Sequence, residues 1–217
     1  MMINIKLTQE LKIKYPKSIF GSMFIMNVPN TKMHEALEKK KHEIEKEIRE
    51  MNINNDNIIA LYNSYFNKWN KVYPVENQIK NIKKGYSFPK ISILVDSMFI
   101  AELKNRILTS GHDLNEIKGS LTFDISKGGE KYIMLNGKEQ ELEKDDIILK
   151  DEEGILASVL FGPAKRTSIT LNTKNVLYLA WCPYEIDDKI VISHLNDISS
   201  NLKIVFNYVI SKIQIHK

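Results

Sequence analysis

The sequence contains few of the features that direct a chain to an oxidising compartment or to a membrane. It has 217 residues and one cysteine, Cys182, so no disulfide can form within the chain. That cysteine usage is typical of a reducing compartment. The first 17 residues carry charges at short intervals and no continuous apolar stretch, which argues against a signal peptide. No run approaches the roughly 18 apolar residues that a membrane-spanning helix needs. We therefore expect a cytoplasmic protein.

Several glycine-dependent enzyme motifs are also absent. The chain contains no G-x-G-x-x-G, P-loop or G-x-S-x-G sequence, so dinucleotide, Walker-type nucleotide and α/β-hydrolase sites lack their signatures. His34 and His42 each precede a glutamate, as in a zinc protease motif. Glu38 and Lys46 stand where the second histidine of that motif would be. With one cysteine and scattered histidines, we expect no metal site and no cofactor.

What remains is the composition of a globular protein with a slight excess of positive charge. Hydrophobic residues make up 43% of the chain and charged residues 27%, which allows a sizeable core. A chain of this length buries about 70% of the surface that its unfolded form exposes, so it needs no disulfide or metal for stability. The net charge of +4 is favourable to a polyanionic partner but too small to identify one. We expect one domain over residues 1–217, with a core at 73–183.

The first half of the chain shows strand periodicity followed by helix periodicity. Between Ile3 and Val28, alternating apolar residues predict two strands separated by a turn at residues 16–18. Beyond them, apolar residues recur at helical spacing, and Asp56 is expected to cap one of the helices. The helices predicted in this way cover residues 31–51, 56–69, 75–84 and 91–103.

After Gly111 the periodicity changes to two, which predicts a sheet. The alternating segments are separated by glycine, proline and asparagine, and Asn136-Gly137 is a strong hairpin signal. Strands are expected at residues 121–126, 131–135, 138–142, 145–150, 155–161, 167–171 and 175–181. A long C-terminal helix is expected over residues 184–217, capped by Asp187 or Asp188 and with an apolar stripe that runs from Ile190 to Ile213. Helices on both sides of a mixed or antiparallel sheet make the fold class α+β.

Five sequence blocks occupy most of residues 73–183. They read VENQIKNIKKGYSFPKISILVDSMF, GHDLNEIKG, SKGGEKYIMLNGKEQEL, DDIILKDEEGILA and TKNVLYLAWC. Their order and spacing resemble those of the B3/B4 domain of the phenylalanyl-tRNA synthetase β subunit, a tRNA-editing domain. In that family the corresponding blocks form two helices, a Gly-Glu hairpin, a strand pair and the strand that leaves the core. The resemblance implies the same core fold for this chain.

The resemblance also implies an activity. In the synthetase this domain hydrolyses the ester of tRNA(Phe) wrongly charged with tyrosine, which implies an RNA-binding protein with a site for an aminoacylated 3′ end. On alignment at Asp113-Leu114, the family's editing histidine falls at Ser110, and His112 stands two residues later. The acidic residue that binds the tyrosine hydroxyl falls at Leu179, which cannot pair with a phenol. The resemblance therefore implies a hydrolytic site without this contact to tyrosine.

Ser110, His112 and Asp113 form the candidate catalytic group. A His-Asp pair can orient a water molecule or accept a proton, and a loop histidine titrates near neutrality. Capping the following turn is the commoner role of an aspartate such as Asp113. Ser110 is either a ligand contact or an ordinary turn serine. These alternatives stay open at this point.

Four further residues, together with Leu179, are candidates for substrate contacts. Asp96 lies in an apolar run, and a carboxylate there needs a partner, so it points into a pocket or caps a backbone segment. Glu130 belongs to a Gly-Glu turn and makes either a substrate contact or a structural hydrogen bond. Arg166 and Thr167 follow a turn, where they meet a phosphate or carboxylate group or remain solvated.

Residues 71–90 combine lysines with aromatic residues. Lysines neutralise phosphates, and aromatic rings stack on the unpaired bases of a tRNA 3′ end. A solvated helix face whose aromatic residues lie in the core gives the same pattern. The candidate nucleic-acid-binding residues are Lys80, Lys83, Lys84, Tyr86 and Lys90.

Two functions are consistent with these observations. The first is a trans-acting deacylase that hydrolyses mischarged aminoacyl-tRNA. The second is a non-catalytic module that binds tRNA or a small ligand and has lost the editing residues. Catalytic turnover distinguishes the two.

Overall fold

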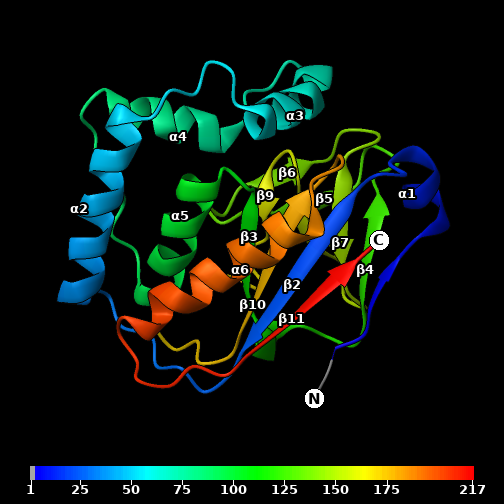
Figure 1. Ribbon diagram of the computed structural model, residues 1–217. Helices are drawn as coiled ribbons and strands as arrows, with labels where there is room; N and C mark the ends of the chain where they lie inside the picture. Colours follow the sequence, from blue (N-terminus) through cyan, green and yellow to red (C-terminus); the bar gives the residue numbers. More distant parts are fainter. Residues whose placement is uncertain (1–2) are drawn as a thin grey trace.

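The computed structural model describes residues 3–217, and two β-sheets that lie face to face form its centre (Figure 1). The larger sheet has the order β1-β4-β7-β8-β9, and the smaller one has the order β11-β2-β10-β3. The larger sheet comprises β1 Ile5–Leu7, β4 Leu121–Ile125, β7 Ile147–Lys150, β8 Ile155–Ser158 and β9 Gly162–Pro163. The smaller sheet comprises β11 Ser211–His216, β2 Ile19–Ile25, β10 Val176–Cys182 and β3 Thr109–Asp113. A hairpin of β5 Lys131–Ile133 and β6 Glu139–Glu141 stands beside them.

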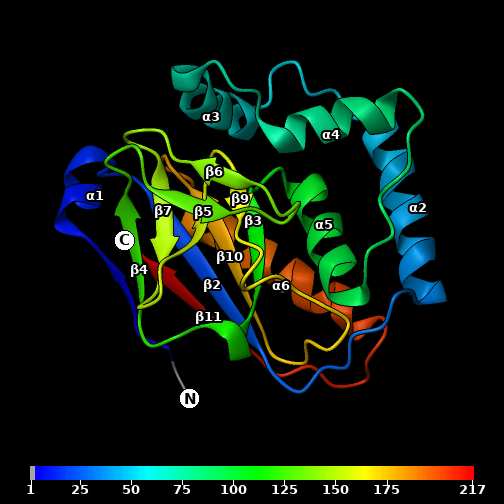
Figure 2. The same ribbon diagram turned by 180° about the vertical axis from the view of Figure 1, so that it is seen from behind.

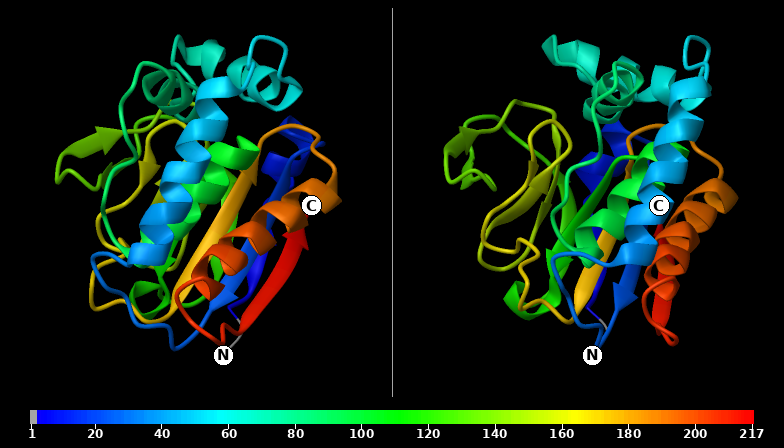
Figure 3. Two further views of the ribbon diagram at one scale, coloured as in Figure 1. Left: turned by 60° about the vertical axis from the view of Figure 1, so that its left-hand side comes forward. Right: turned by 90° about the vertical axis from the view of Figure 1, so that its left-hand side faces the viewer.

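Helices cover the outer side of the smaller sheet and one end of the sandwich (Figures 1 and 2). The helices are α1 Gln9–Lys14, α2 Glu35–Glu50, α3 Asn57–Phe66, α4 Pro74–Lys83, α5 Ile93–Asn105 and α6 Asp188–Lys203, with short 3-10 turns η1 Asn67–Trp69 and η2 Leu114–Glu116. Helix α6 crosses the outer face of the smaller sheet, and α2 packs outside α5 (Figure 3). Strand β1 pairs in parallel with β4, whereas β2, β3 and β11 join antiparallel ladders. The predicted α+β class with a mixed sheet is confirmed.

An aromatic cluster fills the space between the two sheets. Phe20 of β2 stacks on Phe123 of β4 with ring centroids 4.1 Å apart, and Trp181 of β10 meets Phe123 edge-on at 5.1 Å. Each such pair contributes about 0.5–1.5 kcal/mol beyond the burial of its area. On the opposite face of β2, a Cβ at Gly21 would lie 2.7 Å from Val191 Cγ1 of α6. The missing side chain therefore lets α6 pack closely against the sheet.

Several of the predicted elements are present. Asp56 caps α3, since its Oδ1 accepts hydrogen bonds from the backbone N–H groups of Ile58 and Ile59, both at 3.0 Å. Gly85 follows α4 with φ +97, and Gly137 turns the β5–β6 hairpin with φ +81. No helix within residues 3–217 is long and apolar enough to cross a membrane.

The N-terminal segment differs from the predicted pair of strands. The first strand ends at Leu7, and Thr8 begins α1 because its hydroxyl accepts a hydrogen bond from the Leu11 backbone N–H at 3.3 Å. Helix α1 buries Leu11 and leaves its lysines at the surface. A six-residue helix is too short for periodicity to distinguish it from a strand.

Three further predictions were wrong. The C-terminal helix ends at Lys203, and residues 211–216 form β11, which pairs with β2. Residues 167–171 form no strand, whereas residues 109–113, which were treated as a loop, form β3. Both β3 and β11 depend on pairing with strands that are distant in the sequence, so local periodicity does not reveal them.

Candidate functional site

Strand β3 presents Ser110 and His112 on the face that looks toward the larger sheet. In the ladder with β10, Ser110 lies opposite Leu179 and His112 lies opposite Leu177. Residues that are opposite one another in an antiparallel pair share a face, and alternate residues of one strand also share a face. Trp181 stands two residues after Leu179 and packs against the larger sheet. Ser110 and His112 therefore point between the sheets.

A chain of hydrogen bonds links four side chains at this place. Trp181 Nε1 donates to Ser110 Oγ at 2.9 Å, and Ser110 Oγ lies 2.9 Å from His112 Nε2. On the other side of the ring, His112 Nδ1 lies 2.8 Å from Thr167 Oγ1. A hydroxyl, an imidazole and a group that orients the imidazole are the components of an activated oxygen nucleophile. The structure brings Ser110, His112 and Thr167 together in this order.

The imidazole of His112 is fully buried. Burial lowers its pKa to about 4, and the nearby Arg166 charge adds to the effect while Asp151 opposes it. At neutral pH the ring is uncharged, with one nitrogen as a donor and the other as an acceptor. The neutral ring can therefore accept a hydrogen bond from Ser110, although its low pKa makes it a weak base. The prediction that a loop histidine here titrates near neutrality differs from this pKa.

Ser110 lies in the walls of two cavities. One has a volume of about 230 Å³ and is lined by Trp181, Pro74 of α4 and the 157–163 segment. The other has a volume of about 240 Å³ and lies between α5 and the 168–169 segment. The residues that line the second cavity are Ile91, Val95, Met98, Phe99, Thr109, Ser110, Gly111, Leu135, Pro163, Ser168 and Ile169. Drug-sized ligands occupy about 300–1,000 Å³, so each cavity suits a smaller group such as an amino acid side chain.

Arg166 is held by a carboxylate of its own chain. Its guanidinium nitrogens lie 2.8 and 3.2 Å from the two carboxylate oxygens of Asp151, and it also donates to the Glu116 carbonyl at 3.0 Å. Burial raises the pKa of Asp151, but Arg166 and backbone donors outweigh it and hold the pKa below its usual range. The pair fixes the backbone next to Thr167. The carboxylate that Arg166 meets in this structure therefore belongs to the chain itself, and the role of Arg166 as a substrate contact stays a prediction.

Asp113 does not meet His112. Its Oδ1 accepts a hydrogen bond from the Asn115 backbone N–H at 3.0 Å, and its Oδ2 accepts from Thr173 Oγ1 at 2.6 Å. The carboxylate thus caps η2 and anchors the 170–173 turn. Asp113 therefore takes the turn-capping alternative in this structure.

Asp96 is buried against α2. Lys41 Nζ donates to Asp96 Oδ2 at 3.0 Å, and the Ile91 backbone N–H donates to Asp96 Oδ1 at 3.1 Å. Lys41 also binds Glu38 at 2.9 Å and the Pro89 carbonyl at 2.9 Å. The carboxylate thus joins α5 to α2 and does not line the cavities beside Ser110.

Glu130 and Leu179 have local partners. Glu130 Oε2 accepts from Ser126 Oγ at 2.7 Å, and Oε1 accepts from the Lys127 backbone N–H at 2.8 Å, which closes the turn before β5. Leu179 is fully buried opposite Ser110. Its side chain offers no polar contact to a ligand at Ser110.

Most lysines of the 71–90 segment have partners within the chain. Lys80 pairs with Glu76 at 2.6 Å, and Lys90 pairs with Glu38 at 3.2 Å. Lys83 Nζ donates to the carbonyls of Arg49 and Met51, at the C-terminal end of α2, at 2.8 and 2.7 Å.

Lys84 and Tyr86 are placed differently. Both line a cavity of about 550 Å³ at the end of α4, together with Phe88 and Leu103. Tyr86 is 67% exposed. Lys84 and Tyr86 are thus exposed residues of the candidate nucleic-acid-binding segment that line the same cavity.

Trp181 was not among the candidate residues, although it holds Ser110. The ladder gives the reason: β10 lies beside β3, so Trp181 reaches Ser110 from a strand 71 residues away in the sequence. Trp181 follows Leu179 by two residues, so the two side chains lie on the same face of β10. This spacing is the sequence signal that could have identified Trp181 as a neighbour of Ser110.

Two buried acids make stability depend on pH. Burial raises the pKa of Glu102 to about 8 and that of Asp146 to about 7. Glu102 accepts one hydrogen bond, from the Thr109 backbone N–H at 2.7 Å, and Asp146 accepts one from Tyr65 at 2.7 Å. On these acids the folded protein binds protons that the unfolded chain has released, so stability is lost as pH rises through the two raised pKa values. The buried His112 and His194 act in the opposite direction, because their pKa values are lowered to about 4 and the unfolded chain still binds part of their protons near pH 6.5. Between pH 6.5 and 8 the two acids outweigh them.

We expect the free energy of unfolding to fall by about 1–2 kcal/mol between pH 6.5 and 8, at about 1.4 kcal/mol per pH unit for each proton and after the opposing effect of the histidines. Glu102→Gln keeps the acceptor for Thr109 and removes the titration, so its stability should fall by less than half as much. Urea unfolding at pH 6.5, 7.2 and 8.0 measures both slopes. Equal slopes for the two proteins would contradict a protonated Glu102.

Comparisons with known proteins agree with this architecture. The family model described as the B3/4 domain matches residues 61–189. The phenylalanine–tRNA ligase β subunit of Mycoplasma genitalium is 33% identical over 67 residues, and that of Aquifex aeolicus is 35% identical over 65 residues. These segments cover 31% and 30% of this chain, and 8% of each relative.

The fold has a solved counterpart. The crystal structure of an N-terminal fragment of the phenylalanyl-tRNA synthetase β subunit from Pyrococcus horikoshii superposes with a TM-score of 0.54 at 12% sequence identity. The superposition covers 98% of this chain and 55% of that fragment. The likeness extends from the matched blocks to the flanking elements. Since the family model covers more than half of the chain, this protein belongs to the B3/4 domain family.

Proposed function

We propose that this protein binds the aminoacylated 3′ end of a tRNA and hydrolyses the aminoacyl ester in trans. The observation that carries the proposal is Ser110, a residue that lines two cavities and whose Oγ is held by Trp181 and His112. Membership in the B3/4 family and relatives that are β subunits of phenylalanine–tRNA ligase support tRNA as the substrate class. The absence of a disulfide-forming pair of cysteines is consistent with a cytoplasmic site of action.

The chemistry requires one water molecule. In the proposed reaction the water donates a hydrogen bond to Ser110 Oγ, and Ser110 passes its own proton to the neutral His112 as the water attacks the ester carbonyl. The proton of the attacking water passes to Ser110 Oγ, which restores the hydroxyl. The ribose oxygen leaves with the proton that His112 received, so His112 becomes neutral again and the products are free amino acid and tRNA. Thr167 keeps the imidazole ring oriented toward Ser110.

The path of the tRNA follows α4 in this proposal. Pro74, the first residue of α4, lines one cavity at Ser110, and Lys84, just beyond its last residue, lines the cavity that contains Tyr86. Ten helical residues span about 15 Å, which is within reach of a single-stranded 3′ end. Lys84 would neutralise a phosphate, and the exposed Tyr86 ring would stack on a base.

The aminoacyl side chain is expected to be apolar. The cavity beside α5 is lined by aliphatic and aromatic residues, and its polar side chains are the hydroxyls of Thr109, Ser110 and Ser168. Leu179 stands opposite Ser110, where a polar group would be needed to pair a substrate hydroxyl. A buried hydroxyl without a partner costs binding free energy, so tyrosine is disfavoured.

A panel of mischarged tRNAs tests the proposal. We expect multiple-turnover release of amino acid from tRNAs that carry apolar residues, and slower release of tyrosine from tRNA(Phe). The panel should include correctly charged phenylalanyl-tRNA, tyrosyl-tRNA(Phe) and several aliphatic aminoacyl-tRNAs, each against a reaction without protein. Release at the protein-free rate for every substrate would overturn hydrolysis. Saturable tRNA binding in that case would indicate the non-catalytic binding module.

A further inference from the structure

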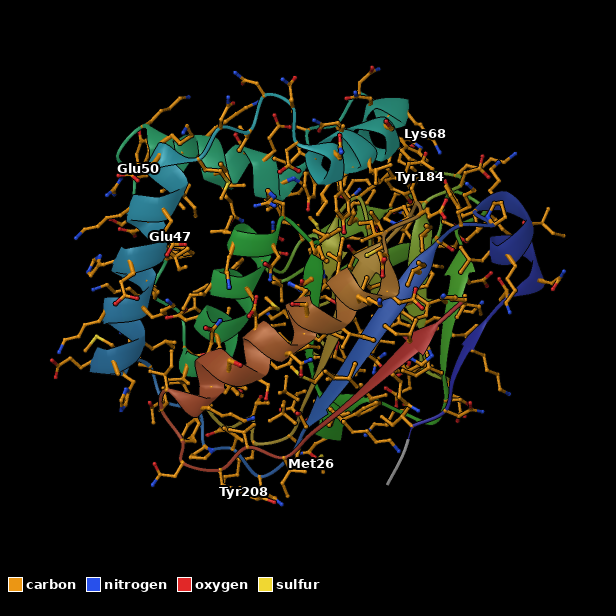
Figure 4. The ribbon with its side chains drawn as sticks, in the orientation of Figure 1. Met26, Glu47, Glu50, Lys68, Tyr184 and Tyr208 are labelled. Carbon is orange, nitrogen blue, oxygen red and sulfur yellow. The ribbon has the colours of Figure 1, made fainter. Side chains whose placement is uncertain are left out.

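Four aromatic rings surround the ammonium group of Lys68, on the side of the molecule where η1 meets the β10–α6 connection. Lys68 Nζ lies 4.7 Å from the Tyr15 ring centroid, 5.3 Å from Tyr184, 5.4 Å from Tyr65 and 5.8 Å from Trp69. All four distances are within the roughly 6 Å over which a ring face attracts a cation. Figure 4 shows Lys68 beside Tyr184 at the edge of the molecule. We call these four rings the aromatic cage.

The cage is held in place by its polar edges. Tyr15 donates to the Asp145 carbonyl at 2.8 Å, Tyr65 to the Asp146 carboxylate at 2.7 Å, and Trp69 Nε1 to the Lys144 carbonyl at 3.2 Å. All three acceptors belong to the connection before β7. The hydrogen-bonding ends of these rings therefore face the protein, and their π faces remain for the cation. A site fixed in this way loses little entropy when it binds.

The ammonium group of Lys68 is poorly suited to the aromatic cage. The Lys68 side chain is exposed, and within residues 3–217 no ion pair or hydrogen bond of its ammonium group is present. A primary ammonium is strongly hydrated and has three hydrogen-bond donors, for which ring faces provide weak acceptors. A cation whose positive charge is covered by methyl groups has no donors to satisfy and fits ring faces better.

We propose that the aromatic cage is a binding site for a trimethylammonium group and that Lys68 is its internal occupant, which the ligand displaces. The flexible four-carbon stem of Lys68 allows the ammonium group to move into solvent without a change in the backbone. The site is separate from Ser110 and independent of the proposed hydrolysis. Two sources carry this chemistry: a trimethylated lysine side chain of a partner and a small metabolite of the choline type.

The first experiment removes the occupant. Tetramethylammonium chloride is titrated into wild-type protein and into Lys68→Ala at constant ionic strength, with sodium chloride as the balancing salt and tryptophan fluorescence or NMR as the readout. We expect saturable binding that is at least about tenfold tighter in Lys68→Ala, because the internal cation no longer competes. Lys71→Ala is the matched control, since Lys71 lies over a single ring, that of Phe161, at 4.4 Å. It should leave the affinity unchanged.

The second experiment tests the cage and its ligand. Adding Tyr184→Ala to Lys68→Ala removes a half-buried ring, and thermal unfolding shows whether the variant is folded. We expect the saturable binding to be lost. A trimethyl-lysine peptide that binds better than choline assigns the ligand to a partner protein, and the reverse assigns it to a metabolite. The proposal is overturned if Lys68→Ala binds tetramethylammonium no better than Lys71→Ala, or if folded Lys68→Ala/Tyr184→Ala binds it equally well.

Discussion

Lys41→Ala is expected to lower the free energy of unfolding by about 3–5 kcal/mol, the usual cost of leaving a buried charge without its partner. Lys41 is 2% exposed, and so is Asp96. The ammonium group makes three contacts, to Asp96, Glu38 and the Pro89 carbonyl, all at 2.9–3.0 Å. Alanine would leave the Asp96 carboxylate with one backbone donor, from Ile91. Urea unfolding followed by circular dichroism measures the loss.

Two further variants show whether the charge is the cause. Lys41→Met/Asp96→Asn removes both charges, fills the volume and keeps an oxygen acceptor for the Ile91 N–H, so it should recover most of the lost stability. Lys40→Ala is the surface control, because Lys40 pairs with the exposed Glu43 at 3.1 Å. Such pairs contribute about 0–1 kcal/mol. A Lys41→Ala protein as stable as Lys40→Ala would refute the buried-pair interpretation.

The elements that were predicted correctly are those with local signals. The apolar run beginning at Ile91 forms α5, Asp56 caps α3, and Asn136-Gly137 turns a hairpin. In each case the residues that determine the structure lie within a few positions of one another. The order of the five sequence blocks predicted the core fold through the family resemblance, which periodicity alone does not reveal.

The elements that were missed depend on distant partners. Strand β11 forms by pairing with β2 at the edge of the sheet, where Ile213 lies opposite Met23. Its residues are mostly half-buried, so its own sequence gives a weak strand signal. Strand β3 is buried on both faces, so its sequence T-S-G-H-D has no alternation of apolar and polar residues. Burial on both faces removes the period-two signal on which strand prediction relies.

The candidate site was only partly visible in the sequence for the same reason. Ser110 and His112 are two residues apart, and their contact follows once β3 is known to be a strand. Thr167 lies 55 residues from His112, and no local pattern indicates that the two meet. The pairing of Asp113 with His112 was inferred from adjacency. In a strand, neighbouring side chains point to opposite faces, so adjacency places these two apart.

Ser110→Ala is expected to reduce kcat for ester hydrolysis by about 10²–10³-fold, the usual effect of removing one well-placed hydrogen-bonding group at the reacting atoms. Loss of the hydroxyl also leaves Trp181 Nε1 without its acceptor, at a cost of about 1–3 kcal/mol in stability. Unfolding measurements therefore accompany the kinetics. Ser168→Ala is the matched control, because Ser168 lines the same cavity and is not part of the hydrogen-bonded chain. It should retain most of the activity.

Thr167→Val separates positioning from contact with the substrate. Valine has the shape of threonine but cannot bond to His112 Nδ1, so the imidazole loses its orientation while Ser110 and the cavities remain. We expect kcat to fall about tenfold with little change in KM, since the substrate does not touch Thr167 in the proposed reaction. With the His112 pKa at about 4, wild-type kcat should not change between pH 5.5 and 8 through this group. Two results would show that His112 does not receive the proton from Ser110. One is a wild-type kcat that falls as the pH is lowered through an apparent pKa near 6.5. The other is a Thr167→Val protein with unchanged kcat.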